Sequence, residues 1–239
     1  MSEKPLDQFL IKTIVPIKIG NVDLSFTNSA LFMVIAVALV TIVMTAGKRS
    51  LVPGRLQSIG EMFYEFVAGL IRDTIGSEGR KYFPIIFTLF MFVLFGNMLG
   101  MIPGAFTFTS HIAVTFAMAA VVFVAVTIIG FVKHGVHFFS FFLPKGVPIA
   151  LWPLIVLIEV ISYLSRPVSL AVRLFANMLA GHALLKVLAG FVPALGIAGV
   201  LPLAVVFGLI GLEFLVAFVQ AYVFAILTCV YLNDAINMH

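Results

Sequence analysis

The chain has 239 residues, of which 62% are hydrophobic and 10% charged, and its mean hydropathy is +1.21. Soluble domains are about 45–50% apolar and about 25% charged, so a soluble or disordered protein is excluded and lipid is the expected solvent. The net charge of +4 forms no basic stripe, which excludes a nucleic-acid-binding protein, and the single cysteine, Cys229, excludes a disulfide scaffold and a multi-cysteine metal site.

The N-terminal region contains no long apolar run. We expect residues 1–28 to form a periplasmic tail and residues 29–239 to form a single membrane domain. The first span is predicted at 29–46, where the apolar run ends before a Gly-Lys-Arg sequence. Charged residues precede this run and no small-residue cleavage site follows it, so it does not resemble a cleaved signal peptide.

Residues 55–75 combine apolar and charged residues at helical spacing. The apolar side consists of Ile59, Met62, Phe63, Phe66, Val67, Leu70 and Ile71. The other side carries Glu61, Glu65, Arg72 and Asp73. We expect an amphipathic helix that lies in the membrane surface or against a partner. An ordinary packed helix fits the same pattern equally well.

Two more runs have the length of one membrane crossing, at 83–102 and at 112–132. Together with two longer apolar stretches nearer the C-terminus, they predict an all-α polytopic membrane protein. It should have about five transmembrane helices and one amphipathic interfacial helix.

The last two apolar stretches are too long to cross a bilayer upright. As a helix, residues 147–190 would be roughly 66 Å long at about 1.5 Å per residue, about twice the hydrocarbon thickness. This segment must therefore tilt steeply, bend or break, and Pro153 and Pro167 are candidate bend points. Residues 201–232 present the same problem, so both helices are expected to be strongly tilted.

Positive charge alternates between the connections. The connection after the first span holds six Lys and Arg residues, and the following three hold none, two and none. Because Lys and Arg gather on the cytoplasmic side, this alternation predicts an outside N-terminus and a cytoplasmic C-terminus. Lys4, Lys12 and Lys18 in the tail are the contrary feature, partly balanced by acidic residues.

Ionisable residues inside the apolar stretches are concentrated in the last two. An ionised group at mid-membrane costs about 2.5–3.5 kcal/mol on insertion scales, so such residues indicate function. The residues concerned are Glu159, Arg166, Arg173, His182, Lys186, Glu213 and Asp234. Snorkelling or a local ion pair is the simplest account of Arg166 and Lys186. Asp234 fits a solvated C-terminal group as well as an intramembrane one.

Arg173 lies in the polar stripe of its helix. At about 100° per residue, the stripe consists of Glu159, Ser162, Arg166, Ser169, Arg173 and Asn177. His182 falls about 180° from Arg173, so either the helix is distorted near Gly181 or His182 faces a different neighbour. A satisfied buried histidine is the simpler alternative for His182, and a structural ion pair is the simpler alternative for Arg173.

The ionisable residues also sort by depth. His182 and Glu213 fall in the outer half of the membrane, and Glu159 and Asp234 fall in the inner half. Carboxylates and histidine can relay protons, whereas an arginine cannot release one. Arg173, between the two halves, would block a direct leak and would attract a mobile carboxylate on a second protein.

Three stretches resemble one known family, subunit a of F-type ATP synthases: the sequence from Ser169 to His182, that from Gln220 to Leu232, and Phe95 to Pro103. The resemblance covers nearly all of the chain after the tail. It implies a proton-translocating stator subunit beside a rotating ring of c subunits, with b-type peripheral stalk subunits as further partners. It also implies a bacterial plasma membrane, or less closely the mitochondrial inner membrane. Some relatives move sodium.

The resemblance further implies roles for single residues. Arg173 matches the family's essential arginine, and Asn177 and Gln220 match its polar neighbours. His182 and Glu213 match an outer half-channel pair, in the order found in mitochondrial and alphaproteobacterial members. The inner exit path would contain the two remaining acids, Glu159 and Asp234.

Two other functions are compatible with parts of the pattern. A self-contained proton-coupled secondary transporter would be expected to show paired repeats with broken helices, and the sequence has no internal repeat. A purely structural scaffold would need no intramembrane charges. The sequence has no GxxxxGK[ST] phosphate loop, so we expect nucleotide chemistry to reside in partners and not in this chain alone. We also expect no cofactor and no bound metal.

Overall fold

The computed structural model describes residues 10–19, 22–23, 25–45, 54–102, 104–142, 148 and 151–237. The α-helices in this part of the chain are α1 (Asn28–Thr45), α2 (Arg55–Thr74), α3 (Phe83–Gly100), α4 (Ile112–His134), α5 (Trp152–Ala194) and α6 (Val200–Ile236). Shorter 3-10 segments are η2 (Ser77–Tyr82), η3 (Phe108–Ser110), η4 (Gly135–Phe142) and η6 (Gly196–Gly199). Five helical segments, all except α2, are long and apolar enough to cross a membrane, which confirms the predicted fold class.

The N-terminal region contains short strands that the sequence pattern does not predict. They are β1 (Thr13–Val15), β2 (Lys18–Ile19), β3 (Val22–Asp23) and β4 (Phe26–Thr27). β1 pairs with β4, and β2 pairs with β3, both antiparallel. Asn28 fixes the entry into α1, because its Oδ1 accepts hydrogen bonds from the N–H groups of Lys12 at 3.1 Å and Ser29 at 2.9 Å.

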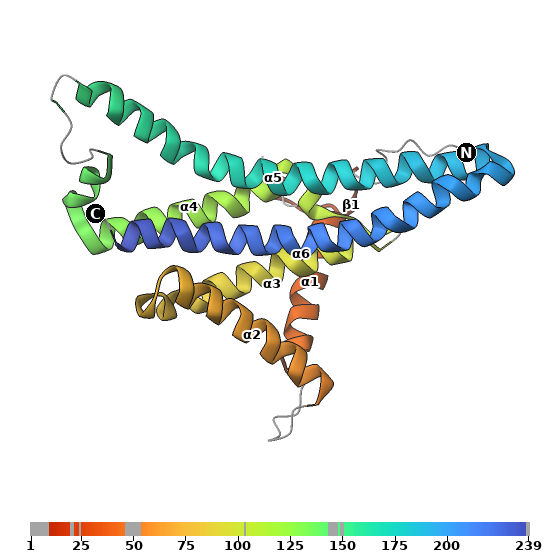
Figure 1. Ribbon diagram of the computed structural model, residues 1–239, viewed down its shortest axis with the longest axis horizontal. Coiled ribbons are helices and arrows are strands. Elements are labelled where there is room, and N and C mark those ends of the chain that lie inside the picture. Colours follow the sequence, from red (N-terminus) through yellow and green to blue (C-terminus); the bar gives the residue numbers. More distant parts are fainter. Residues whose placement is uncertain are drawn as a thin grey trace.

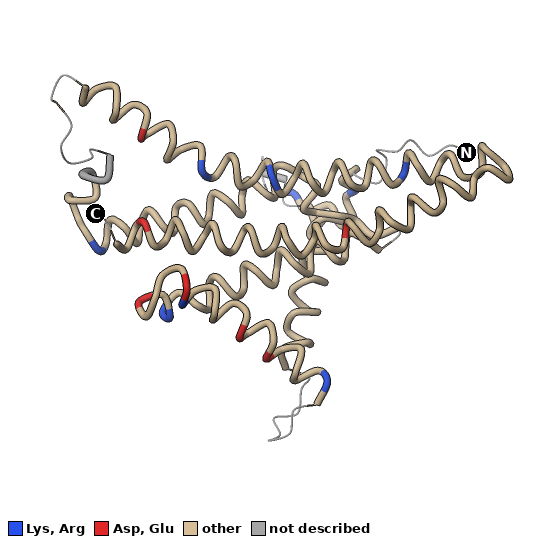
Figure 2. The backbone as a smooth tube through the Cα atoms, viewed as in Figure 1, with Lys and Arg blue, Asp and Glu red and all other residues tan. Residues whose placement is uncertain are grey.

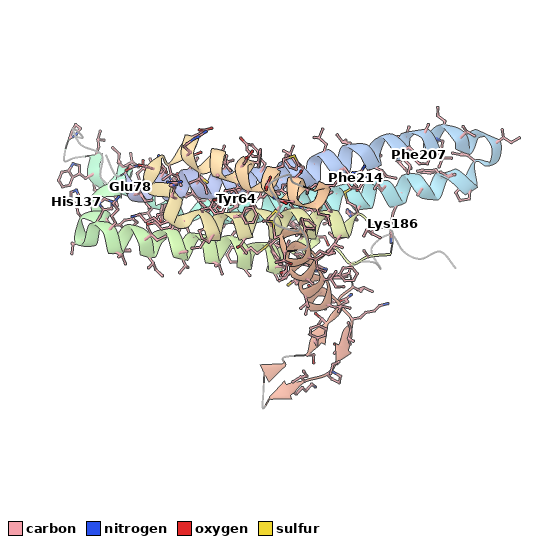
Figure 3. All side chains as sticks on the ribbon, turned by 90° about the horizontal axis from the view of Figure 1, so that it is seen from below. Tyr64, Glu78, His137, Lys186, Phe207 and Phe214 are labelled. Atoms are coloured by element: carbon pink, nitrogen blue, oxygen red, sulfur yellow. The ribbon has the colours of Figure 1, made fainter. Side chains whose placement is uncertain are left out.

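Helices α3 to α6 run side by side, whereas α1 runs across them (Figures 1 and 3). Small side chains let α6 approach its neighbours closely: Ala217, Ala221 and Ala225 are fully buried. Larger residues fill the space around them, including Phe90 of α3 and Leu174 of α5. This packing holds α5 and α6 against each other as one hairpin.

α5 is one continuous helix that changes direction along its length (Figure 1). Pro167 lies inside it, where a proline removes a backbone hydrogen bond and bends a helix. The suggestion that Pro153 also bends the helix is wrong. Pro153 occupies the first turn, where the missing N–H would have no intrahelical partner. α5 ends at Ala194, later than the predicted 190, and residues 147 and 149–150 lie outside the described part of the chain.

α2 packs at the edge of the bundle against α1, α3 and α6 (Figures 1 and 3). Val67 and Ile71 are buried against the main core, so one edge of α2 is packed as in an ordinary helix. A neighbouring apolar flank stays open, since Met62 is 59% and Ile59 41% exposed. Charged residues gather along α2 and η2, while the long helices carry few (Figure 2). The buried edge fits the interpretation as an ordinary packed helix, and a position in the membrane surface or against a partner stays a prediction for the exposed flank.

Candidate functional site

His182 of α5 and Glu213 of α6 lie together inside the bundle. Their Nδ1 and Oε2 atoms are 3.9 Å apart, and their side chains are 11% and 12% exposed. His182 Nε2 lies 2.9 Å from the carbonyl oxygen of Gly100 and 3.3 Å from Oγ1 of Thr107. The ring is thus enclosed by α5, by α6 and by the connection between α3 and α4. Because α5 stays helical here, His182 faces a different neighbour from Arg173, the second of the two alternatives.

Gly181 gives the Glu213 carboxylate its space. A Cβ atom at position 181 would lie 2.6 Å from Glu213 Oε1, closer than real Cβ contacts allow. The sequence pattern raises Gly181 only as a point of possible distortion. In the structure, its missing side chain allows a carboxylate from another helix to come close. A contact between two helices of this kind cannot be predicted from the residues around Gly181 alone.

Asn97 of α3 adds an amide to this region. It is fully buried, and its Nδ2 donates to the carbonyl oxygen of Ala217, one turn from Glu213 on α6, at 3.3 Å. Among the described residues, neither Asn97 Oδ1 nor the two carboxylate oxygens of Glu213 has a hydrogen-bond partner. Buried acceptors of this kind are costly unless water or an exchanging proton reaches them. Asn97 belongs to the stretch 95–103 but carries no role in the sequence interpretation.

Arg173 lies on a different face of α5 from His182. Its side chain is exposed, and within the described part of the chain it makes no hydrogen bond or ion pair. Asn177, one turn further, is half-buried, and Gln220 of α6 is 8% exposed. No hydrogen bond joins these two amides to Arg173 in the described residues. The guanidinium is thus available to a partner at an uncovered face of the hairpin.

Arg166 is paired instead with Asp234. Its Nη1 lies 3.1 Å from Asp234 Oδ2, and its guanidinium lies 4.9 Å from the Tyr231 ring centroid and 5.4 Å from that of Tyr163. The local ion pair that the sequence pattern offers for Arg166 is therefore present. Asp234 is a partner in this pair, 34% exposed, instead of a freely solvated terminal group.

The remaining charged residues of α5 are not joined to this ion pair. Glu159 is half-buried, and the described residues give it no ion pair. The N-terminal part of α5, which carries it, diverges from the end of α6 that carries Asp234 (Figure 1). Lys186 lies towards the tip of the α5–α6 hairpin, at the same end as Phe207 and far from Glu78 (Figure 3). Across the described ranges, no three His, Cys, Asp or Glu residues form a group that could hold a metal ion.

Comparison with known proteins covers nearly all of the membrane region. Residues 29–233 match the family model described as ATP synthase A chain. The chain belongs to the ATP synthase A chain family. Six of the seven predicted site residues lie inside the matched range, and Asp234 lies one residue beyond it.

Relatives in this family, each named ATP synthase subunit a, match over nearly their full lengths. The Rhodospirillum rubrum protein is 61% identical over 238 residues, which cover 98% of this chain and 99% of the relative. The Paramagnetospirillum magneticum protein is 58% identical over 98% of this chain and 99% of its own. The Pelagibacter ubique protein is also 58% identical, over 100% of both chains. Membership of the family agrees with an all-helical, multi-pass membrane protein.

Proposed function

We propose that this chain is the proton-conducting stator subunit of the membrane sector of an F-type ATP synthase. Membership of the ATP synthase A chain family supports a membrane-sector subunit of that complex. The observation that carries the finer proposal is Arg173, an intramembrane cation in the polar stripe of α5 that is exposed and makes no ion pair with the described residues. In lipid such a group is costly, so it calls for an anionic partner that docks on this face.

The partner we propose is a ring of c subunits whose lipid-facing carboxylates pass Arg173 one at a time. Near the guanidinium a carboxylate is stabilised as the anion and gives up its proton. Beyond it, in lipid, the same carboxylate must be protonated again before it moves on. Arg173 cannot release its own proton, so it separates two half-channels without conducting between them.

The outer half-channel in this proposal contains His182 and Glu213. Their separation of 3.9 Å and low exposure suit a pair that passes protons from the outer aqueous side towards the ring. Gln220 and Asn177 would line the way to Arg173, because they lie within about one or two helical turns of these residues.

The inner half-channel would contain Glu159 and Asp234. Glu159 lies in the N-terminal part of α5, which diverges from the end of α6 (Figure 1). Asp234 would act together with Arg166, with which it forms an ion pair at 3.1 Å near the C-terminal end of α6. Protons released by the ring would leave by this route.

Partners and orientation follow from the same assignment. The rest of the ATP synthase, including b-type peripheral stalk subunits, would bind this chain, and the complex would supply all nucleotide chemistry. The N-terminus would lie outside a bacterial plasma membrane and the C-terminus in the cytoplasm. α1 lies at a steep angle to the other long helices (Figures 1 and 3). If α1 spans the bilayer upright, those helices are therefore strongly tilted.

Cross-linking tests whether the Arg173 face meets the ring. Ser169 and Ala176 are exposed one turn before and after Arg173, and a cysteine at either position should cross-link to c subunits in the assembled complex. A cysteine at exposed Glu61 of α2 is the control and should not cross-link to them. A secondary transporter would instead move protons as the isolated chain in liposomes. Flux from the isolated chain, with no cross-link to the ring, would refute the proposal.

A further inference from the structure

Both ring nitrogens of His182 face backbone carbonyl oxygens. Nδ1 lies 3.0 Å from the carbonyl oxygen of Met178, and Nε2 lies 2.9 Å from that of Gly100. A protonated imidazole carries two N–H groups and can donate to both, whereas a neutral one carries a single N–H. After losing the Nε2 proton, the ring would present a bare acceptor nitrogen to another acceptor. The site therefore needs a second donor if His182 is to release and rebind a proton.

Thr107 has a side-chain hydroxyl near enough to be that donor. Its Oγ1 lies 3.3 Å from His182 Nε2 and also donates to the carbonyl oxygen of Gly100 at 3.1 Å. Thr107 is 3% exposed, so bulk water does not easily replace it. A hydroxyl is both donor and acceptor and can rotate about its C–O bond. Its O–H can therefore point to Gly100 or to His182 without moving the backbone.

The connection between α3 and α4 holds Thr107 in this position. A Cβ at Gly100 would lie 2.5 Å from Thr107 Oγ1, so glycine is needed for the close approach. The carbonyl oxygen of Thr107 accepts hydrogen bonds from Ser110, from its Oγ at 2.6 Å and its N–H at 3.2 Å. The threonine side chain thus has little freedom beyond rotation of its hydroxyl.

We propose that Thr107 is a positioning residue for proton exchange at His182, an inference that rests on the proposed function. In the neutral state, the ring keeps its Nδ1 proton on the Met178 carbonyl and accepts the Thr107 O–H at Nε2. A proton arriving from the outer aqueous side binds Nε2, and that new N–H donates to Gly100. The Thr107 hydroxyl then turns back to the same carbonyl, and the ring stands as a cation 3.9 Å from the Glu213 carboxylate.

The test compares hydroxyl-free and hydroxyl-bearing variants in the assembled complex. Thr107→Val and Thr107→Ala should lower passive proton conduction by roughly three- to tenfold, the effect of one lost hydrogen bond. Thr107→Ser should restore it. Thr115→Val is the matched control, because the buried hydroxyl of Thr115 bonds only to carbonyl groups at the start of its own helix. That variant should conduct normally.

The pH profile separates positioning from a merely structural effect. Without the hydroxyl the neutral ring loses a donor, so the change of conduction with pH should move to higher pH in the two hydroxyl-free variants. Glu213 on α6 lies 3.9 Å from the ring and Lys186 follows one turn later on α5, and these variants leave both groups in place. A drop in conduction with an unshifted profile, or without rescue by serine, would overturn the inference.

His182→Ala keeps the two proposals distinguishable. If this variant pumps normally, the proposed outer half-channel is wrong, whatever Thr107 does. If it fails to pump while Thr107→Val matches Thr115→Val, the half-channel stands and the Thr107 inference alone is overturned. The amount of assembled complex, measured for each variant, ensures that conduction is compared per complex.

Discussion

Gly181 of α5 and Glu213 of α6 are matched in shape, because a single added methyl group at position 181 would overlap the carboxylate. The match fixes where the carboxylate can lie relative to His182, the next residue along α5. The close approach of the two helices here depends on the missing side chain of a glycine and not on a hydrogen bond or ion pair between these two residues. A small substitution should therefore separate the contribution of carboxylate position from that of its charge.

Gly181→Ala should lower proton conduction by roughly tenfold or more, since the new Cβ would lie 2.6 Å from Glu213 Oε1 and the carboxylate would have to shift relative to His182. Helix stability itself should not fall, because alanine favours a helix over glycine. Passive conduction by the membrane sector measures the effect. Gly190→Ala is the control on the same helix, where a Cβ would meet nothing within 4 Å. Equal conduction in the two variants would contradict the assignment.

Gly96→Ala should destabilise the junction of α3 with the α3–α4 connection. The new Cβ would overlap the Cζ atom of Phe108, which is fully buried and has little room to move. Overpacking of this kind costs about 1–3 kcal/mol. Thermal denaturation of the purified complex measures the loss. Gly69→Ala on α2, with open space around its Cβ, should leave the transition unchanged.

Removing the ion pair between Arg166 and Asp234 should weaken the contact of α5 with the end of α6. The two side chains are 22% and 34% exposed, so solvent screens part of the interaction, and a coupling of about 1 kcal/mol is expected. A double-mutant cycle with Arg166→Met and Asp234→Asn, read by thermal denaturation of the complex, measures it. Additive effects of the two substitutions would show that the pair contributes nothing.

The membrane-spanning helices could be predicted from the sequence because span length and hydropathy are local properties. The same is true of α2, whose apolar and charged residues repeat at helical spacing. The strands of the N-terminal region could not be predicted, since they are only two or three residues long and show no period. The effect of Pro153 could not be predicted, because a proline bends a helix only from inside it and the sequence did not show that the helix starts beside Pro153.

The contacts of the site could not be predicted because they join distant parts of the chain. His182 meets Gly100, 82 residues away, and Arg166 meets Asp234, 68 residues away. Helical geometry correctly separates the directions of His182 and Arg173, but it cannot say which element fills each direction. Only the packing of the α3–α4 connection against α5 supplies Thr107 and the Gly100 carbonyl.

ATP-driven proton pumping by a complex that carries Arg173→Ala tests the central claim most directly. The account predicts that the variant assembles in normal amounts and pumps no protons, because ring carboxylates then meet no fixed cation between the half-channels. Arg173→Lys, which keeps the charge but not the planar guanidinium, should also fail or nearly fail to pump. Normal pumping by the alanine variant, at wild-type levels of assembled complex, would contradict the account.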